Sequence, residues 1–282
     1  MILREAKLSS GWYPRQRGQI EEFLEPAAKK AKSEGVFASA VLAPHAGWYY
    51  SGALAAQVVS LLDPRAETVA VIGGHLPASM PILSASEDAV KTPLGLLEID
   101  RELRNEFESR LSCRPDNYDD NTVEVLLPML HYFFPKVKLL WLRFPAHINS
   151  FEAGKALKKS AEALGRRTAV IISTDLTHYG ANYGFAPKGS GKSALDWVKN
   201  VNDAAFIEAV LAGDPFLVLK RADKDFSSCS AGAVLGGLGF VDAAGETPVK
   251  TGKKLLAYGT SADVTGEETP ASFVGYASIL LG

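Results

Sequence analysis

Residues 168–180 read TAVIISTDLTHYG, and this stretch carries the main evidence for the fold. Its first six residues, Thr168–Ser173, are apolar or small at almost every position, which is typical of a strand buried on both faces. Strands of that kind occur in parallel sheets whose two sides are covered by helices. The polar residues that follow, Asp175 and His178 among them, are therefore expected at the carboxyl end of a buried strand.

Three more runs of the same kind precede it, namely Ala40–Ala43, Thr68–Gly73 and Val137–Leu142. Helix-like segments alternate with these runs and continue after them: Ala53–Leu62, Arg101–Ser109, Thr122–Phe134, Phe151–Leu164, Ala194–Leu211, a helix that ends near Arg221, and Ala231–Leu238. This alternation predicts an α/β fold with a mainly parallel central sheet flanked by helices. Leu255–Ala262 and Phe273–Leu281 read as two final strands that pair with each other, an antiparallel pairing being one arrangement. No linker interrupts the pattern, so we expect one domain over residues 1–282.

The composition excludes several classes of protein. Hydrophobic residues make up 47% of the 282 residues, and the net charge of −2 lacks the basic excess of a nucleic-acid-binding protein. No run approaches the roughly 18 apolar residues of a membrane span, and the polar N-terminus lacks the apolar segment of a secretory signal. Two cysteines, Cys113 and Cys229, do not make a disulfide framework, although a single bridge between them stays open. We therefore expect a cytoplasmic protein that binds neither nucleic acid nor a membrane.

Three of the five histidines follow predicted strands directly. His45, His75 and His178 each come just after one of the buried runs, with glycines close by. The carboxyl ends of parallel strands form the edge at which open α/β sheets bind ligands. One histidine in such a place is more often a cap or a surface residue, but three in equivalent positions indicate a shared polar pocket. His131 and His147 have no such context, and we interpret both as structural or surface residues.

Asp175 lies three residues before His178. If this turn begins a helix, the two side chains share a face. The carboxylate would then fix the imidazole tautomer and raise its pKa, which suits a general base. The alternative, compatible with the first, is that Asp175 caps the turn.

Cys229 lies in a polar turn before a segment of small residues that reads as a helix. A cysteine near a helix N-terminus has a lowered thiol pKa, so its thiolate is available as a metal ligand or a nucleophile. The alternative is a small buried residue, which is the ordinary environment of a free cysteine. Cys113 lacks comparable surroundings.

Two glycine-rich stretches match nucleotide-binding motifs only in part. Gly189–Ser193 reads GSGKS, but Ala186 stands where a P-loop needs glycine, and no strand precedes the loop. The glycines from Gly232 to Gly239 lack both the strand and the spacing of a dinucleotide fingerprint. We interpret the first stretch as a flexible basic loop and the second as a closely packed helix.

Several motifs together resemble those of the Memo family. PHAGWYYSG at residues 44–52 is similar to the family's PHAGY-x-YSG, and STDLTHYG at residues 173–180 is similar to its SSDLSHYG. Shorter matches are Trp12–Pro14 to WYP, Thr92–Gly95 to TPLG, Glu124–Pro128 to E-V-x-LP, and Cys229 with its small successors to CG-x-x-P. They follow the family's order over nearly the whole chain, which is thus identified as a Memo-like protein, of the type of protein B of the AmmeMemoRadiSam system.

The resemblance implies a fold related to the class III extradiol dioxygenases, which hold Fe(II) with two histidines and a carboxylate. Memo-like proteins keep two histidines and a cysteine, so His45, His75 and Cys229 would be the metal ligands. Asp175 and His178 would orient a ligand or act as acid and base. Fe(II) is the first expectation for the metal, with copper or zinc as alternatives, because imidazole and thiolate form a borderline-soft donor set. The family's gene context implies AMMECR-type and radical-SAM proteins as partners.

Three positions depart from the family's pattern. The loop before His75 is one residue shorter than the family's GP-x-H, which bears on whether His75 has the register of a ligand. Asn121 stands where the family often has a histidine, and Ser230 replaces the glycine that usually follows the cysteine.

Three functions are compatible with these residues. The first is a metal-dependent oxidoreductase of dioxygenase-like type, in which His178 moves a proton with help from Asp175. The second is a metal-binding redox protein that carries iron or copper without turnover. The third is a binding module whose pocket takes a small molecule or a peptide, with Trp48, Tyr49 and Tyr50 as its recognition surface.

Overall fold

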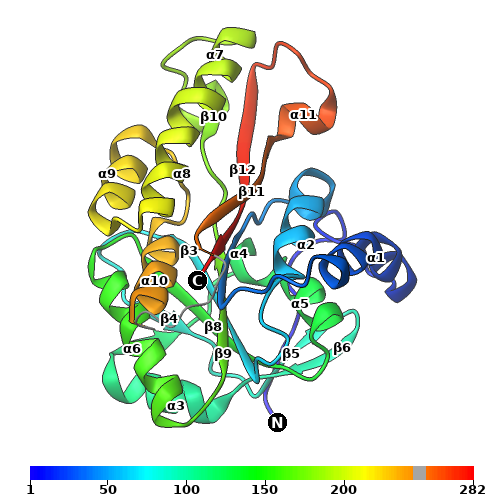
Figure 1. The fold of residues 1–282 in the computed structure, drawn as a ribbon, viewed down its shortest axis with the longest axis vertical. Coiled ribbons are helices and arrows are strands. Elements are labelled where there is room, and N and C mark those ends of the chain that lie inside the picture. Colours follow the sequence, from blue (N-terminus) through cyan, green and yellow to red (C-terminus); the bar gives the residue numbers. More distant parts are fainter. Residues whose placement is uncertain (244–251) are drawn as a thin grey trace.

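The computed structural model describes residues 1–243 and 252–282 (Figure 1). Within these residues a large sheet has the strand order β10-β12-β2-β9-β3-β8-β4-β7, and β11 also pairs with β12. Its strands are β2 (Ala40–Ala43), β3 (Thr68–Leu76), β4 (Ile82–Ser84), β7 (Cys113–Pro115), β8 (Lys138–Pro145), β9 (Thr168–Ser173), β10 (His178–Gly180), β11 (Lys254–Thr260) and β12 (Ser272–Leu281). A small second sheet, in the order β1-β5-β6, consists of β1 (Leu3–Arg4), β5 (Ala89–Thr92) and β6 (Gly95–Glu98).

The centre of the large sheet is parallel, as the apolar runs predict. β2, β9, β3 and β8 run side by side in the same direction, so that Ala40, Val170, Ala70 and Leu140 form one row across the sheet. Most of the outer pairs are antiparallel: β12 runs against β2, β10 and β11, and β4 runs against β8, whereas the edge strand β7 runs parallel to β4. The sheet is therefore mixed, and the expectation of a mainly parallel sheet describes its centre. The antiparallel pairing of the last two long strands is confirmed.

Helices cover both faces of the sheet. They are α1 (Arg17–Glu34), α2 (Ala53–Val59), α3 (Arg101–Arg110), α4 (Asn121–Glu124), α5 (Leu127–Phe133), α6 (Asn149–Ala163), α7 (Lys192–Trp197), α8 (Asp203–Ala212), α9 (Pro215–Asp225), α10 (Ala231–Ala243) and α11 (Ser261–Thr265). Two π-helical turns, η1 (Trp48–Gly52) and η3 (Val198–Asn202), and one 3₁₀ turn, η2 (Ala181–Tyr183), complete the described elements. No helix of the described ranges combines the length and apolarity needed to cross a membrane.

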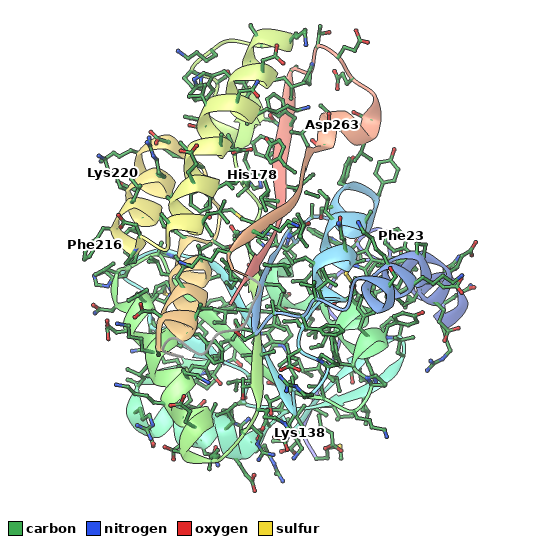
Figure 2. All side chains as sticks on the ribbon, in the orientation of Figure 1. Phe23, Lys138, His178, Phe216, Lys220 and Asp263 are labelled. Carbon is green, nitrogen blue, oxygen red and sulfur yellow. The ribbon has the colours of Figure 1, made fainter. Side chains whose placement is uncertain are left out.

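The alternation of side chains along the central strands divides the interior into two cores. Val41, Val69 and Ile171 pack with α1, α2 and α5 on one face. On the other face, Leu42 packs with α3, α6, α8 and α10, together with the row of Ala40, Val170, Ala70 and Leu140. The two helical layers lie on opposite sides in Figure 1, and Figure 2 shows Phe23 of α1 and Lys220 of α9 at opposite flanks.

The helix α10 lies against α6 at a separation that only glycine permits. A Cβ atom on Gly154 would lie 1.8 Å from the carbonyl oxygen of Gly236, and one on Gly239 would lie 1.9 Å from that of Phe151. The interpretation of the glycine-rich segment as a closely packed helix is therefore confirmed. At the start of α10, just after Cys229, a Cβ atom on Gly232 would lie 2.2 Å from the Pro145 carbonyl oxygen, so the helix begins against the end of β8.

Several local features of the structure differ from the predictions. The expected helix Thr122–Phe134 is divided into α4 and α5, because Pro128 in the first turn of α5 cannot donate a backbone hydrogen bond to the preceding turn. The turn after Asp175 begins no helix; His178 starts the strand β10 instead. Neither α1 nor the small sheet is predicted by the hydrophobic pattern, since the strands have two to four residues and α1 is mostly exposed and contains Pro26.

Candidate functional site

Three strand ends and one distant loop meet at the carboxyl edge of the parallel strands. His45 follows β2, His75 lies near the end of β3, and Asp175 follows β9. The loop before α10 reaches the same place, where the Cys229 N–H donates a hydrogen bond to the Asp175 carbonyl oxygen (3.3 Å). Residues up to 184 positions apart in the chain are thus brought together.

His45, His75 and Cys229 form a compact cluster. One potential ligand atom from each residue lies within 4.8 Å of the other two. His45 Nε2 is 3.2 Å from Cys229 Sγ, and the two imidazole rings meet edge to face with their centroids 4.9 Å apart. A single metal ion could contact all three side chains.

The tautomer of His45 follows from its hydrogen bonds. The Ser173 hydroxyl donates its only proton to the Thr122 carbonyl oxygen, so it accepts from His45 Nδ1–H (2.9 Å). The lone pair of a neutral His45 is then on Nε2, the atom that faces Cys229. The His45 N–H donates to Asp175 Oδ1 (2.7 Å), which fixes the backbone of this loop.

His75 reaches the cluster through an irregular strand end. The register of β3 on β8 shifts between Gly73 and Leu76, and His75 has a left-handed φ of 57°. A Cβ atom on Gly74 would collide with the Ser230 side chain at 2.4 Å, so this glycine lets β3 approach the loop that carries Cys229. The short loop before His75 therefore still places its ring beside His45.

A carboxylate orients His75 from behind. Asp120, which caps the N-terminus of α4, accepts a hydrogen bond from His75 Nδ1–H (3.0 Å), and this leaves Nε2 as the nitrogen that faces Cys229. Buried Arg143 lies 3.1 Å from the same oxygen of Asp120 and donates to the Gly74 carbonyl oxygen. Burial raises the pKa of Asp120, but the bond to His75, the charge of Arg143 and the Thr122 side chain outweigh it and lower this pKa to about 2.

The thiol of Cys229 is placed where its thiolate is stabilised. Burial disfavours the thiolate, but the two neighbouring imidazoles outweigh burial and lower the pKa of Cys229 well below its ordinary value. The Asp175 N–H also donates to Sγ (3.3 Å). Cys113, by contrast, has a pKa raised to about 12, first by burial and then by Glu108. Both thiols are free, so no bridge joins them.

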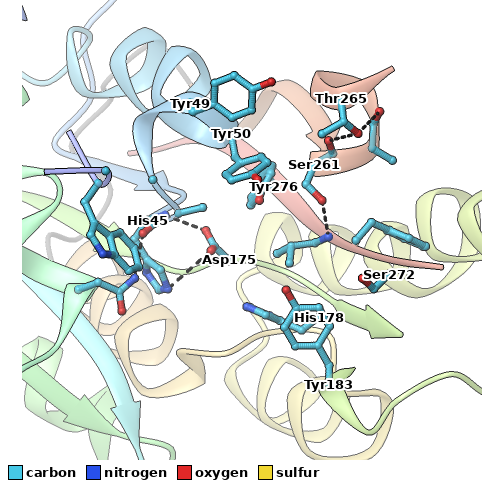
Figure 3. A pocket seen from close by; sticks show the side chains of 18 of the residues that line it. His45, Tyr49, Tyr50, Asp175, His178, Tyr183, Ser261, Thr265, Ser272 and Tyr276 are labelled. Atoms are coloured by element: carbon cyan, nitrogen blue, oxygen red, sulfur yellow. Dashed lines mark hydrogen bonds and ion pairs between the residues drawn. The ribbon is translucent and has the colours of Figure 1, made fainter. Parts of the chain in front are cut away.

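His178 and Asp175 lie near each other, but the expected contact between the carboxylate and the imidazole is not formed. No hydrogen bond between them occurs among the described residues; the His178 Nδ1–H donates to the Leu176 carbonyl oxygen (3.1 Å). The imidazole packs edge-on against Tyr183 (Figure 3). Asp175 is 3% exposed, and burial, followed by the charge of Cys229, raises its pKa despite nearby His45. Asp175 therefore acts mainly on the His45 loop.

A cavity of about 680 Å³ opens in front of these groups, and Figure 3 looks into it. His45, His75, Asp175 and His178 line its inner part. Residues of η1, η2, α11, β12 and the N-terminal segment form its walls. Tyr49 and Tyr50 of η1 are exposed at this cavity, whereas Trp48 is buried and its indole N–H donates to the Val125 carbonyl oxygen. Only two of the three aromatic residues considered as a recognition surface can contact a ligand.

Comparison with known proteins shows the family of this chain. The family model described as Memo-like protein matches residues 4–280. The chain belongs to the Memo-like family. It is 29% identical over 299 residues to a MEMO1 family protein of Pyrococcus abyssi, covering 99% of both chains, and 30% identical over 256 residues to one of Methanococcoides burtonii, covering 88% of both. The crystal structure of an uncharacterized protein from Escherichia coli K12 is similar with a TM-score of 0.49 and 14% identity, over 86% of this chain and 99% of that one.

In this Memo-like chain the sequence patterns located four residues that line the cavity, and Cys229 beside two of them, but missed the groups that orient them. Asp120, Arg143 and Ser173 were not assigned to the site. A signal for Asp120 exists, because an Asp two residues before Thr122 at the start of a helix is a typical N-cap. Arg143 sits inside a buried strand, where nothing in the local sequence indicates a role.

Proposed function

We propose that this Memo-like chain binds one metal ion through His45, His75 and Cys229 and uses it for redox chemistry on a small molecule in the adjoining cavity. Fe(II) is our first assignment, with copper or zinc as alternatives. The observation that carries the proposal is the orientation of both imidazoles, since Ser173 and Asp120 hold the outer nitrogens and the inner nitrogens turn toward Cys229. Histidine ligands in metal sites are typically oriented in this way.

The donor set fits a borderline-soft ion. Two neutral imidazoles and one thiolate suit iron, copper or zinc better than magnesium or calcium. Three protein ligands leave coordination positions open, and both histidines line the cavity, so a ligand could reach the ion from there. Such an ion supplies Lewis acidity and, for iron or copper, a change of oxidation state.

His178 is our candidate for proton transfer in a dioxygenase-like oxidoreductase. Its Nδ1–H is held by the Leu176 carbonyl oxygen, so a neutral His178 carries its lone pair on Nε2. Because the ring lines the cavity, that nitrogen could accept a proton from a bound ligand. Asp175 would contribute through its charge and by holding His45. We further propose AMMECR-type and radical-SAM proteins as partners of this activity.

A second candidate is a metal-binding redox protein without turnover. It is favoured by Cys229, because the iron-dependent oxygenases use a carboxylate where this chain has a thiolate. A binding module for peptides is favoured less, since Trp48 is buried in the core.

Elemental analysis of protein purified without a His-tag tests the proposal. We expect about one equivalent of iron, copper or zinc in the wild-type protein or after anaerobic reconstitution with Fe(II), and a loss of that metal in Cys229→Ala and His45→Ala. Cys113→Ala and His147→Ala are matched controls that should keep the metal. An oxygen-uptake screen on the loaded protein then separates turnover from metal binding. Wild-type protein that holds no metal under either condition would refute the site.

A further inference from the structure

Among the described residues, the cavity in front of the metal cluster is lined by neither Lys nor Arg. Asp175 and Glu267 of its lining are acidic. Another hollow of the molecule shows the contrast, being lined by Arg65, Lys136, Lys138, Arg166 and Arg167. Anionic ligands such as carboxylates and phosphates are usually bound by Arg or Lys. The three histidines of its inner part donate their Nδ1–H groups within the protein, to Ser173, Asp120 and Leu176, so the walls beyond the cluster contain no cationic side chain among the described residues.

Aromatic rings make up much of the wall. Those of Trp12, Tyr49, Tyr50, Tyr183 and Tyr276 line the cavity. In Figure 3, Tyr50 and Tyr276 lie on one side of the Asp175 carboxylate and Tyr183 lies on the other, beside His178. Burial, followed by the negative charge of Asp175, raises the pKa of both Tyr183 and Tyr276. The faces of such rings attract cations.

One oxygen of Asp175 is left without a donor. Its Oδ1 accepts the His45 N–H, whereas Oδ2 accepts no hydrogen bond among the described residues and lies 3.9 Å from His45 Nε2. The residue is 3% exposed and lines the cavity. A carboxylate oxygen that reaches the cavity without a protein donor can accept an N–H from a ligand there.

We propose that the cavity takes a small organic cation, a protonated amine carried on an aromatic or apolar group. The ammonium group lies among the rings of Tyr50, Tyr183 and Tyr276 and donates to Asp175 Oδ2. The apolar part of the ligand extends along the remaining aromatic wall. The small cation would be the ligand of the cavity used in the proposed function. That the cation is also a substrate rests on the proposed function.

Three probes of nearly equal shape test the charge preference. Tyramine is cationic, 4-ethylphenol is neutral and 4-hydroxyphenylacetate is anionic. The full chain is titrated by calorimetry twice, once after treatment with a chelator and once after loading with Zn²⁺. In both states tyramine should bind about tenfold more tightly than 4-ethylphenol. In the chelated protein 4-hydroxyphenylacetate should bind most weakly. Equal or tighter binding of the neutral or anionic probe in the chelated protein would overturn the proposal.

Two variants locate the binding site. Asp175→Asn keeps an acceptor for the His45 N–H, and Tyr183→Leu replaces a partly exposed ring, so both are compatible with the fold. In each, the ratio of tyramine to 4-ethylphenol affinity should fall toward one. Tyr118→Leu, at an exposed tyrosine outside the cavity, should leave the ratio unchanged. An unchanged ratio in both cavity variants contradicts the site. Because the affinity ratio is measured in chelated protein, its outcome is independent of the metal content that tests the proposed function.

Discussion

Asp120 and Asp203 are two carboxylates with little or no exposure. Asp120 contacts His75 and Asp203 contacts Thr177, next to His178, and their pKa values are shifted in opposite directions. The pKa of Asp120 is lowered to about 2, because its bond to His75 and the charge of Arg143 outweigh burial. The pKa of Asp203 is raised to about 6, because burial outweighs its hydrogen bonds. Asp203 accepts from Thr177 N–H (3.1 Å), from the Thr177 hydroxyl and from the Tyr258 hydroxyl (2.7 Å).

The difference shows what kind of partner keeps a buried carboxylate charged. Cationic donors stabilise the ionised form of Asp120 despite burial, whereas the neutral donors around Asp203 do not fully offset the loss of water. Asp120 is thus a charged acceptor that can increase the basicity of His75 as a metal ligand. Asp203 instead holds the loop between Asp175 and His178 in place through Thr177.

Removing the charged acceptor should have the largest effect. Asp120→Ala leaves His75 without its orienting carboxylate and should lower the affinity for metal about 10- to 100-fold, the usual cost of losing such a partner. Competition with a chromophoric chelator measures this. Asp119→Ala, at the exposed neighbour that pairs with Lys7, should bind metal like the wild type. Equal affinity in the two variants would contradict the role of Asp120.

Removing the carboxylate with neutral partners should change the pH dependence of stability. The folded chain binds the Asp203 proton more tightly than the unfolded chain, because its pKa is raised from 3.8 to about 6. Its contribution is most favourable at low pH and falls as the pH rises from about 4 to 6. Between pH 4 and pH 8 the unfolding free energy of the wild type should fall by about 2 kcal/mol more than that of Asp203→Asn.

Denaturant titrations at several pH values measure this difference. Asp196→Asn, at an exposed helix position paired with Lys192, is the matched control and should follow the wild type. Parallel pH curves for the wild type and Asp203→Asn would show that burial does not raise this pKa.

Removing a neutral acceptor at the metal cluster should have the smallest effect. Ser173→Ala takes away the hydrogen bond from His45 Nδ1–H, but His45 stays buried and its backbone stays bound to Asp175. A neutral hydrogen bond contributes about 1 kcal/mol, so the affinity for metal should fall only about fivefold. The chelator competition used for Asp120→Ala gives the comparison. A larger loss than in Asp120→Ala would reverse the ranking of charged and neutral acceptors.

The strands of the sheet centre were predictable because their side chains are apolar on both faces. That pattern depends only on neighbouring residues, and it located Ala40–Ala43 and Thr168–Ser173 at the bounds the structure has. The break between α4 and α5 was less clear, since one proline decides it. The positions of His45 and Asp175 just after buried strands followed from the same local pattern.

The sequence by itself thus determined the α/β class, the family and the residues that could act as ligands. Only the tertiary structure decided that Cys229 lies 3.2 Å from His45 Nε2, 184 positions away in the chain. It also decided which nitrogen of each histidine faces the cluster, and which carboxylate stays charged. The reason is physical: strand patterns arise from local burial, whereas tautomers, pKa shifts and ligand geometry depend on contacts between segments that are distant in the chain.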